Sequence, residues 1–545
     1  MPPTPTPDLP YDIWLHITSF LPLSQLKTLY PANSALLEIA LDARYRTEFI
    51  GPLAHPDTKR ALARLTDPFV ARRVRTFIFK PGDLCRLLQE SKYEESKSEE
   101  SKFEEQYERK LVDAFSGMRI SQPSARPHTR PRNHTSNIPP PHFLSLCTCS
   151  PALPTTPTSD TTPSPHLKTY KRVMSIMRGM AGLAELHVEI SCKDYWYFTN
   201  SGADAGVPAL FAAGWQAFGR SLRVLELRVP LEDLALVLPL PEDGVVLECL
   251  EKVSLSIIRA SLTTNEEIVL RSTVLPFLRT YRNTLRSLAL DVQEHTNLSP
   301  FLSSLALPPT RMRFLSSFFL ARPFISTEQT DFSGLHAFLL AHNEHLTSLS
   351  LKMNATFTHH ATPEVFFSHQ SFALALPILQ HLSIHLAHFP SGHAGGIIPY
   401  IHQFAQTLVS LTLQGQFWPD HRVLALLEGF GLDSRLRDLR MAVATFGPAL
   451  LSALAEHLPA LEILDLDFKE ISPPCYIPGF GSPFSLLLSQ LSFPDWRLHK
   501  LEMKPLDATD SIRKLCKAAL VNALPGVLLF CGRNREEYVS TTDLI

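Results

Sequence analysis

The sequence predicts an α/β protein in which a short helical module precedes a long array of parallel strands and helices. Three observations predict this class. Residues 9–46 carry apolar residues at helical spacing, and residues 91–168 are rich in Glu, Lys, Pro, Ser and Thr. The spacing L-x-x-L-x-L, with Val, Ile, Phe or Met in place of some Leu residues, occurs eleven times between residues 183 and 503. Repeated strand and helix periodicities along a chain are typical of a parallel sheet covered by helices.

The N-terminal stretch reads as three short helices. Pro10 and Asp12 suit a first helical turn, because the missing N–H of Pro would be unpaired there and the carboxylate favours the positive end of the helix dipole. Asn33 is a plausible N-cap of the third helix. A module this small buries little surface alone, so its exposed apolar residues indicate a partner. The apolar stripes consist of Ile13, Ile17, Phe20 and Leu21, then Leu23, Leu26 and Leu29, then Leu36, Leu37, Ala40 and Leu41.

The run L-P-x-D-I-x-x-x-I-x-x-F-L-P over residues 9–22 resembles the F-box, as found in basidiomycete fungal proteins where it leads into an irregular leucine-rich array. The family often has a Trp in the third helix, where this chain has Leu36 or Leu37, and Pro31 shortens the second helix. A generic helical cap on the array is the alternative. The resemblance implies binding to the adaptor subunit of a cullin–RING (SCF-type) ubiquitin ligase through Leu9, Pro10, Ile13, Ile17, Leu21, Pro22, Leu26 and Leu29.

Composition narrows the class of partner and the compartment. The 545 residues include 51 basic and 53 acidic side chains, a net charge of −2, so no global charge attracts nucleic acid or an anionic membrane. Eight cysteines dispersed over so long a chain indicate reduced thiols and a cytoplasmic or nuclear setting. The first ten residues do not resemble a secretory signal, and no apolar run reaches the roughly 18 residues that a membrane helix needs.

The array is interrupted early by an insert. Residues 51–90 are expected to hold a connection and the first strand unit, with a helical connection over residues 47–67 and a strand ending at Phe79. Residues 91–105 are three copies of a five-residue Ser-Lys-Glu unit, and the composition then turns to Pro, Ser, Thr and His. We expect residues 91–168 to be disordered, because they lack the apolar surface that offsets chain entropy. The predicted divisions are therefore residues 1–50, 51–90, 91–168, 169–505 and 506–545.

The repeat over residues 169–505 recurs at intervals mostly near 28 to 31 residues, as between Leu285, Leu315 and Leu346. The L-x-L alternation places apolar side chains on one face of a strand, and helical stretches such as residues 331–342, 398–406 and 448–457 follow. This pattern resembles the leucine-rich repeat in its irregular, ribonuclease-inhibitor-like form. The resemblance implies a solenoid with parallel strands on the concave side and helices outside, closed by a cap over residues 506–545 that ends in a strand at residues 527–531.

Strand residues that point away from the apolar ladder should form the binding face for a protein substrate. In register they run from His187 and Glu226 at one end to Asp465 and Glu502 at the other, with Gln414 and Ala442 in the row beside them. The middle units are small and polar, and the ends are charged, so we expect most contacts in the C-terminal rows. The predicted substrate-binding residues are Arg228, Lys352, His385, Arg440, Asp465, Asp467 and Glu502.

The sequence lacks the common catalytic motifs. The sequence has no phosphate loop, zinc-protease helix, nucleophile elbow or dinucleotide fingerprint. Cys147 and Cys149 could ligate zinc, but a structural site usually needs four ligands, so an accidental pair is the simpler interpretation. We therefore expect no cofactor, no metal and no enzymatic activity.

Two functions remain at this point. The first is a substrate-recognition subunit of an SCF-type ligase, whose partners are the adaptor and a protein substrate, with no nucleic acid, membrane or small-molecule substrate. The second is a leucine-rich protein-interaction scaffold unrelated to ubiquitination. They differ in whether Pro10, Ile17 and Leu21 are exposed for a partner or buried against the array.

Overall fold

A computed structural model describes most of the helical module and the array. The described residues are 9–29, 31–82, 84, 106, 165–190, 206–239, 244–258, 265–292, 296–324, 331–355, 367, 369–387, 396–473, 483–505 and 519–537. The chain divides into one unit of residues 1–86 and 172–545 and a second unit of residues 87–171. Only a few residues of the second unit are described. Most of the insert predicted to be disordered lies outside the described residues, but residues 165–168 belong to a helix that begins at Pro165, so its predicted end at residue 168 is corrected. The Cys147–Cys149 pair and residues 506–518 and 538–545 of the predicted cap also lie outside the described residues.

The N-terminal module contains helices α1 (Tyr11–Ser19), α2 (Leu23–Leu29) and α3 (Ser34–Tyr45). Pro10 immediately precedes α1, and its carbonyl accepts the N–H of Trp14 at 3.2 Å. Asn33 caps α3, because its side-chain oxygen accepts the N–H of Leu36 at 2.8 Å. The short polar side chain thus satisfies a donor that the first turn of a helix leaves unpaired.

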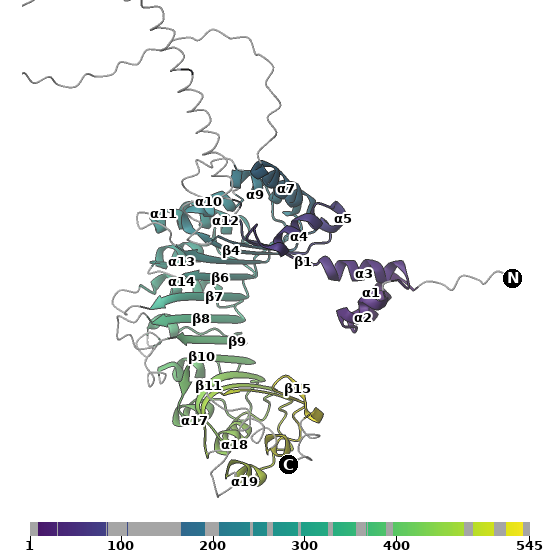
Figure 1. Cartoon of the computed structure of the whole chain (residues 1–545). Coiled ribbons are helices and arrows are strands. Elements are labelled where there is room, and N and C mark those ends of the chain that lie inside the picture. The colour runs from purple at the N-terminus through teal and green to yellow at the C-terminus, as the bar shows by residue number, and fades with distance from the viewer. Residues whose placement is uncertain are drawn as a thin grey trace, which may run out of the picture. The chain divides into compact units, whose positions relative to one another are not determined.

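The fifteen strands of the described residues form one sheet in which each strand pairs only with its neighbours in sequence (Figure 1). The pairs from β1 to β14 are parallel, and β15 runs antiparallel to β14. The predicted α/β class with a long parallel sheet is therefore confirmed. The strands are β1 (Thr47–Ile50), β2 (Thr76–Phe79), β3 (Glu185–Glu189), β4 (Val224–Pro230), β5 (Lys252–Ile258), β6 (Ser287–Val292), β7 (Ser317–Phe324), β8 (Ser348–Ala355), β9 (His381–Ala387), β10 (Ser410–Trp418), β11 (Asp438–Phe446), β12 (Ile463–Ile471), β13 (Lys500–Pro505), β14 (Leu529–Phe530) and β15 (Arg533–Asn534).

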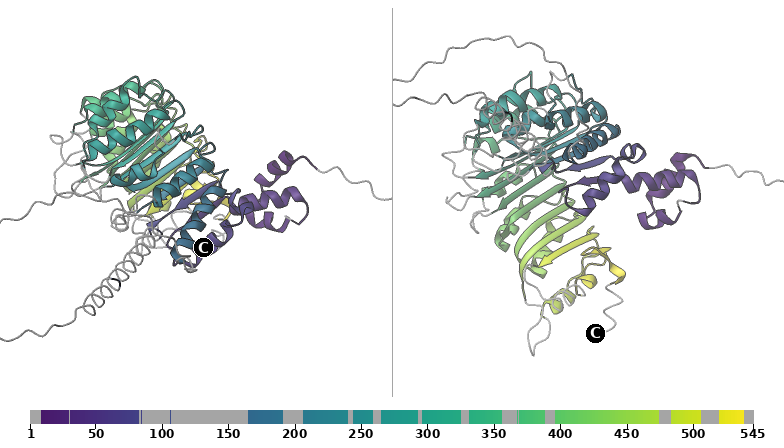
Figure 2. Two further views of the ribbon diagram at one scale, coloured as in Figure 1. Left: turned by 90° about the horizontal axis from the view of Figure 1, so that it is seen from above. Right: turned by 45° about the horizontal axis from the view of Figure 1, so that its top comes forward.

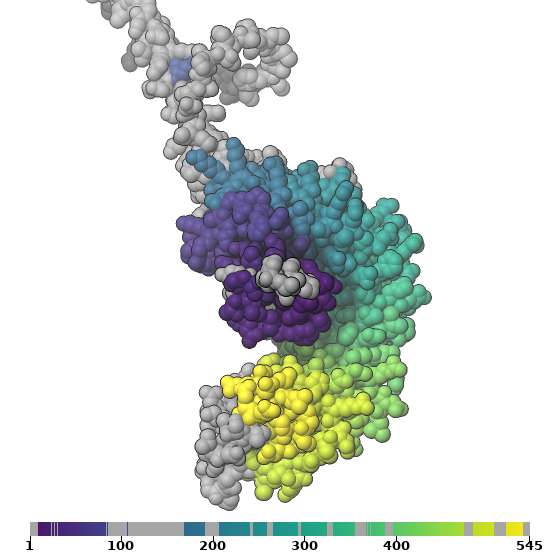
Figure 3. Space-filling model, turned by 90° about the vertical axis from the view of Figure 1, so that its right-hand side faces the viewer, coloured from purple at the N-terminus to yellow at the C-terminus, as the bar shows by residue number. Residues whose placement is uncertain are grey.

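Helices line one face of this sheet, and no described helix of the repeats packs on the other, which we call the open face (Figures 1 and 2). The apolar ladder points toward the helices, and Leu225, Leu227, Leu288 and Leu290 are fully buried there. Figure 3 shows the repeats as a continuous surface from blue to yellow. The helices are α4 (Pro56–Leu65), α5 (Pro68–Ala71), α7 (Pro165–Gly179), α9 (Gly206–Phe218), α10 (Leu234–Val237), α11 (Glu266–Val269), α12 (Leu275–Thr280), α13 (Ser299–Ala306), α14 (Ser333–His342), α16 (Ile397–His402), α17 (Asp420–Glu428), α18 (Pro448–His457) and α19 (Pro483–Ser489).

Close packing between neighbouring repeats is clearest at α13 and α14. The Ser299 hydroxyl accepts the N–H of Gly334 at 2.7 Å. A Cβ atom at residue 334 would lie 2.0 Å from the Ser299 carbonyl oxygen, so only Gly fits there. The two helices begin side by side for this reason, and neighbouring repeats stack directly on each other.

Two sequence predictions are corrected. Thr47–Ile50 is strand β1 rather than part of a helical connection, because it pairs with β2 and so extends the sheet by one strand. The final strand, expected over residues 527–531, covers only Leu529–Phe530. The chain then reverses at Cys531 and Gly532, whose φ angles are 49° and 75°, and it returns as β15. Among the described residues, no helix is both long enough and apolar enough to cross a bilayer.

Candidate protein-binding surfaces

The first candidate surface is the apolar face of the N-terminal module. Leu9, Ile13, Ile17 and Phe20 are 46%, 42%, 39% and 74% exposed, and Leu29 on α2 is 39% exposed. Pro10 and Pro22 are also exposed. This many large apolar side chains in contact with water on one small module is typical of a protein-interaction surface.

The module's own core explains why these residues stay outside. Leu26, Leu36, Ile39 and Ala40 form a buried cluster, and Trp14 packs against it. Leu26 is only 4% exposed, so it belongs to this core and is not on the exposed surface of the module, unlike the predicted residues of α1. The pattern placed Leu26 on an apolar stripe but did not show that α2 turns this residue toward α3.

Leu21 is neither fully exposed nor fully buried. It is half-buried and lines a cleft of about 920 Å³, whose other lining residues include Tyr11 and Leu15 of α1 and Arg75 and Arg223 of the array. The predicted adaptor-binding set therefore divides into exposed residues, the half-buried Leu21 and the buried Leu26.

A buried arginine joins α3 to the first repeat. Arg73, which is 5% exposed, hydrogen-bonds to the carboxylates of Glu38 and Asp42, and its guanidinium lies 4.2 Å from the centre of the Phe69 ring. Burial lowers the pKa of Arg73, but the hydrogen bonds that its guanidinium donates to Glu38 and Asp42 outweigh burial and raise it. The sequence showed only a basic run at this point. Nothing local indicated that one of its three arginines would be buried.

The second candidate surface is the open face of the sheet. The strand pairing places the predicted row from His187 to Glu502 side by side, one residue per strand from β3 to β13. The row next to it breaks after Gln414, which does not pair with Ala442 as expected. A bulge lies between Leu413 and Trp418, where Gly415 has a φ of 86°. The glycine lets the backbone leave the ladder with β11 for four residues, 414–417.

Charges at the N-terminal end of the open face are paired with one another. The Nδ1 atom of His187 lies 3.0 Å from an Oε2 atom of Glu226. This hydrogen bond raises the pKa of His187 and lowers the pKa of Glu226. Glu189 lies 2.6 Å from the Lys80 ammonium and 3.8 Å from the guanidinium of Arg228, a predicted substrate-binding residue.

Charges at the C-terminal end are paired in the same way. Arg440 donates to both carboxylate oxygens of Asp438 at 3.2 and 3.1 Å. Both oxygens of Asp465 accept from Lys504 at 3.1 Å, and Glu502 lies 3.8 Å from Lys500. Burial raises the pKa of Asp467. Most charges that the sequence assigned to substrate binding therefore already have a partner within the protein.

The middle of the open face differs from both ends. Lys352 of β8 and His385 of β9 are paired neighbours in the sheet, and Ser350 and Ser383 are paired neighbours two residues earlier. The structure thus brings together two predicted residues, Lys352 and His385, and separates them from Arg228 and from the charged C-terminal group.

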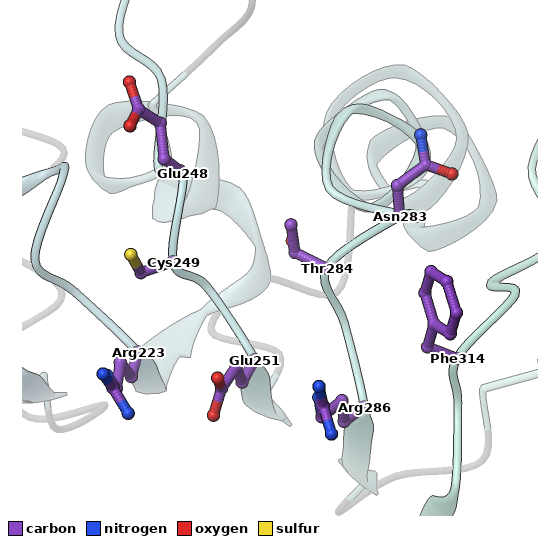
Figure 4. A pocket seen from close by; sticks show the side chains of 8 residues that line it. All are labelled: Arg223, Glu248, Cys249, Glu251, Asn283, Thr284, Arg286 and Phe314. Carbon is purple, nitrogen blue, oxygen red and sulfur yellow. The ribbon is translucent and has the colours of Figure 1, made fainter.

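A pocket of about 300 Å³ lies where strands β4, β5 and β6 begin (Figure 4). Its lining carries both signs of charge, and the thiol of Cys249 is free and exposed. Among the described residues, no group of three or more His, Cys, Asp or Glu side chains is placed to hold a metal ion. The pocket residues are Arg223, Glu248, Cys249, Glu251, Asn283, Thr284, Arg286 and Phe314.

Comparison with known proteins adds no relative. No protein-family model matches the sequence, and no curated protein is significantly similar to it.

Proposed function

We propose that this protein is the substrate-recognition subunit of an SCF-type ubiquitin ligase. Its N-terminal module binds the adaptor subunit, and the open face of the array binds a protein substrate. Such a receptor performs no chemistry itself. It raises the effective concentration of the substrate near the ubiquitin-carrying subunits.

The observation that carries this proposal is the exposed apolar surface of α1. Ile13, Ile17 and Phe20 remain in contact with water, although the module has a core that could have received apolar side chains. A helical cap whose only role is to close the array would turn these residues toward the array, because burying each would contribute roughly 1.5–3 kcal/mol. Their exposure favours a partner over a cap.

The alternative is a leucine-rich scaffold without a link to ubiquitination. The shared feature of the two functions is the open face, which suits a protein ligand in either case. Only adaptor binding by the module separates them.

The test measures binding of a purified adaptor subunit to the full-length protein by biolayer interferometry. An Ile17→Asp/Phe20→Asp variant places two charges on the exposed side of α1. A Leu432→Asp variant is the matched control, because Leu432 is 76% exposed on the array, close to the 74% of Phe20. Circular dichroism confirms that each variant is folded.

We expect the wild type and Leu432→Asp to bind the adaptor with the same affinity, and the α1 variant to lose binding. A folded wild-type protein that does not bind any adaptor would refute the ligase function and favour the scaffold.

A further inference from the structure

Four neighbouring strands, β7 to β10, form the middle of the open face. Three rows of side chains cross them in register, and we call these residues the central patch. The rows are Ser317, Ser348, His381 and Ser410, then Phe319, Ser350, Ser383 and Thr412, then Ala321, Lys352, His385 and Gln414. All except the buried Ala321 are at least partly exposed.

The central patch has an unbalanced charge. None of its residues, all of which the structure describes, is Asp or Glu, while Lys352, His381 and His385 are basic. Neither Lys352 nor His381 forms an ion pair with a described carboxylate. At the patch borders, Asp291 of β6 is one strand beyond Ala321, and Asp438 of β11 is held by Arg440.

The other side chains suit an anionic ligand as well. Serine and threonine hydroxyls can donate hydrogen bonds to carboxylate oxygens. Their small size also allows the backbone of a ligand to approach the sheet closely. Phe319 is the single aromatic residue of the patch, so it offers an apolar contact in the centre of a polar surface.

The spacing of these groups defines a peptide pattern. His381 precedes His385, the neighbour of Lys352, by four residues along a strand, which is about 13 Å at 3.3 Å per residue. Phe319 on β7 pairs with Ser350, two residues before Lys352, so it is level with the midpoint of this distance but lies one strand beyond Lys352 and two strands beyond His381. An extended ligand presents residues i, i+2 and i+4 on one side. Acidic residues at i and i+4 with an apolar residue at i+2 would meet all three features.

We infer that the central patch binds an extended acidic segment of a protein substrate with the pattern acidic-x-apolar-x-acidic. Its carboxylates contact His381 at one end and Lys352 with His385 at the other, and its apolar side chain packs on Phe319. The identity of the occupant as a ligase substrate rests on the proposed function. Carboxylates fit better than phosphate dianions, because the patch holds one permanent cation and no Arg, the residue best shaped to bind phosphate.

The test uses the full-length protein and fluorescein-labelled peptides measured by anisotropy. The probe peptide contains the core Glu-Ser-Leu-Ser-Glu, and its control has Gln in both Glu positions. The Lys352→Gln/His381→Gln variant removes the two basic groups. The matched control is Lys469→Gln/His421→Gln, which makes the same chemical changes at exposed positions outside the patch.

We expect the Glu peptide to bind the wild type and the control variant equally, and the patch variant about fivefold to tenfold more weakly. The Gln peptide should bind more weakly by a similar factor. Equal affinity of the two peptides, or equal loss in the two variants, would overturn the inference. So would binding of a phosphoserine version of the peptide where the Glu version does not bind.

The same preparations separate this inference from the proposed function. The Ile17→Asp/Phe20→Asp variant should keep its affinity for the Glu peptide, because α1 contributes no residue to the patch. Adaptor binding without peptide binding would refute the central patch alone, and peptide binding without adaptor binding would refute the ligase function alone.

Discussion

The replacement Asp233→Asn tests the electrostatics of the array's interior. Asp233 ends a single turn of 3-10 helix (Leu231–Asp233) after β4, and it is only 2% exposed. No described residue hydrogen-bonds to its Oδ2 atom. Burial, with a smaller contribution from the charge of Glu232, raises the pKa of Asp233 to about 7.

The size of the effect follows from this shift. The ordinary pKa of an Asp side chain is 3.8. In the folded protein the Asp233 carboxyl therefore keeps its proton to a pH about three units higher than in the unfolded chain. Between about pH 4 and pH 7 the native state binds more protons than the unfolded state, so the free energy of unfolding falls as the pH rises. At 1.36 kcal/mol per unit, the full loss is about 4 kcal/mol above pH 7.

An Asn at this position cannot ionise and should remove this loss. Urea unfolding can be followed by tryptophan fluorescence, because the Trp215 indole N–H donates to the Val237 carbonyl at 3.0 Å, close to the replaced residue. At each pH, the free energy of unfolding of the variant is subtracted from that of the wild type. The contributions of the other titrating groups, which both proteins share, then cancel. The difference in unfolding free energy should fall by about 4 kcal/mol from pH 4 to pH 8.

A Glu232→Gln control should reduce the pH dependence only slightly, since it removes the smaller cause of the shift. Parallel pH profiles for the wild type and Asp233→Asn would show that the carboxyl is ionised in the folded state, and would refute the argument.

Three further predictions follow from the module and the open face. Leu26→Ala should destabilise the module by about 2–5 kcal/mol, measured by hydrogen exchange of α3, and lower adaptor binding as a consequence. Arg73→Met should increase exchange in α3 without changing exchange in β10, because it leaves two carboxylates unpaired; unchanged α3 exchange would contradict the anchoring role. Glu226→Gln should lower stability most near pH 5–6, above the ordinary pKa of Glu and below that of His187, because the Glu226 pKa is lowered and the His187 pKa is raised. A stability difference independent of pH would refute this pairing.

Much of the strand arrangement could be predicted from the sequence. The L-x-x-L-x-L units correspond in order to β3 through β13, and the row from His187 to Glu502 is in register. Such a pattern can be recognised because it is local. In a strand, successive side chains point to opposite faces, so a few apolar residues determine which face each neighbouring residue occupies.

The partners of charged residues could not be predicted in the same way. The pattern placed Asp465 and Lys504 on the open face, but their hydrogen bond joins residues 39 positions apart, and it depends on side-chain geometry across two strands. Likewise, β1 was not predicted, because its four residues are too few to show a clear strand periodicity. They form a strand by pairing with β2.

By itself, the sequence determined the repeat, the faces of its strands and the apolar stripes of the N-terminal helices, because each depends on spacing within one element. Only the tertiary structure decided which side of a stripe is exposed. It buried Leu26 and left Ile17 in contact with water, and it paired the charges at both ends of the open face while leaving Lys352 without an acidic partner among the described residues. These outcomes depend on contacts between segments that are distant in sequence, and no local periodicity encodes them.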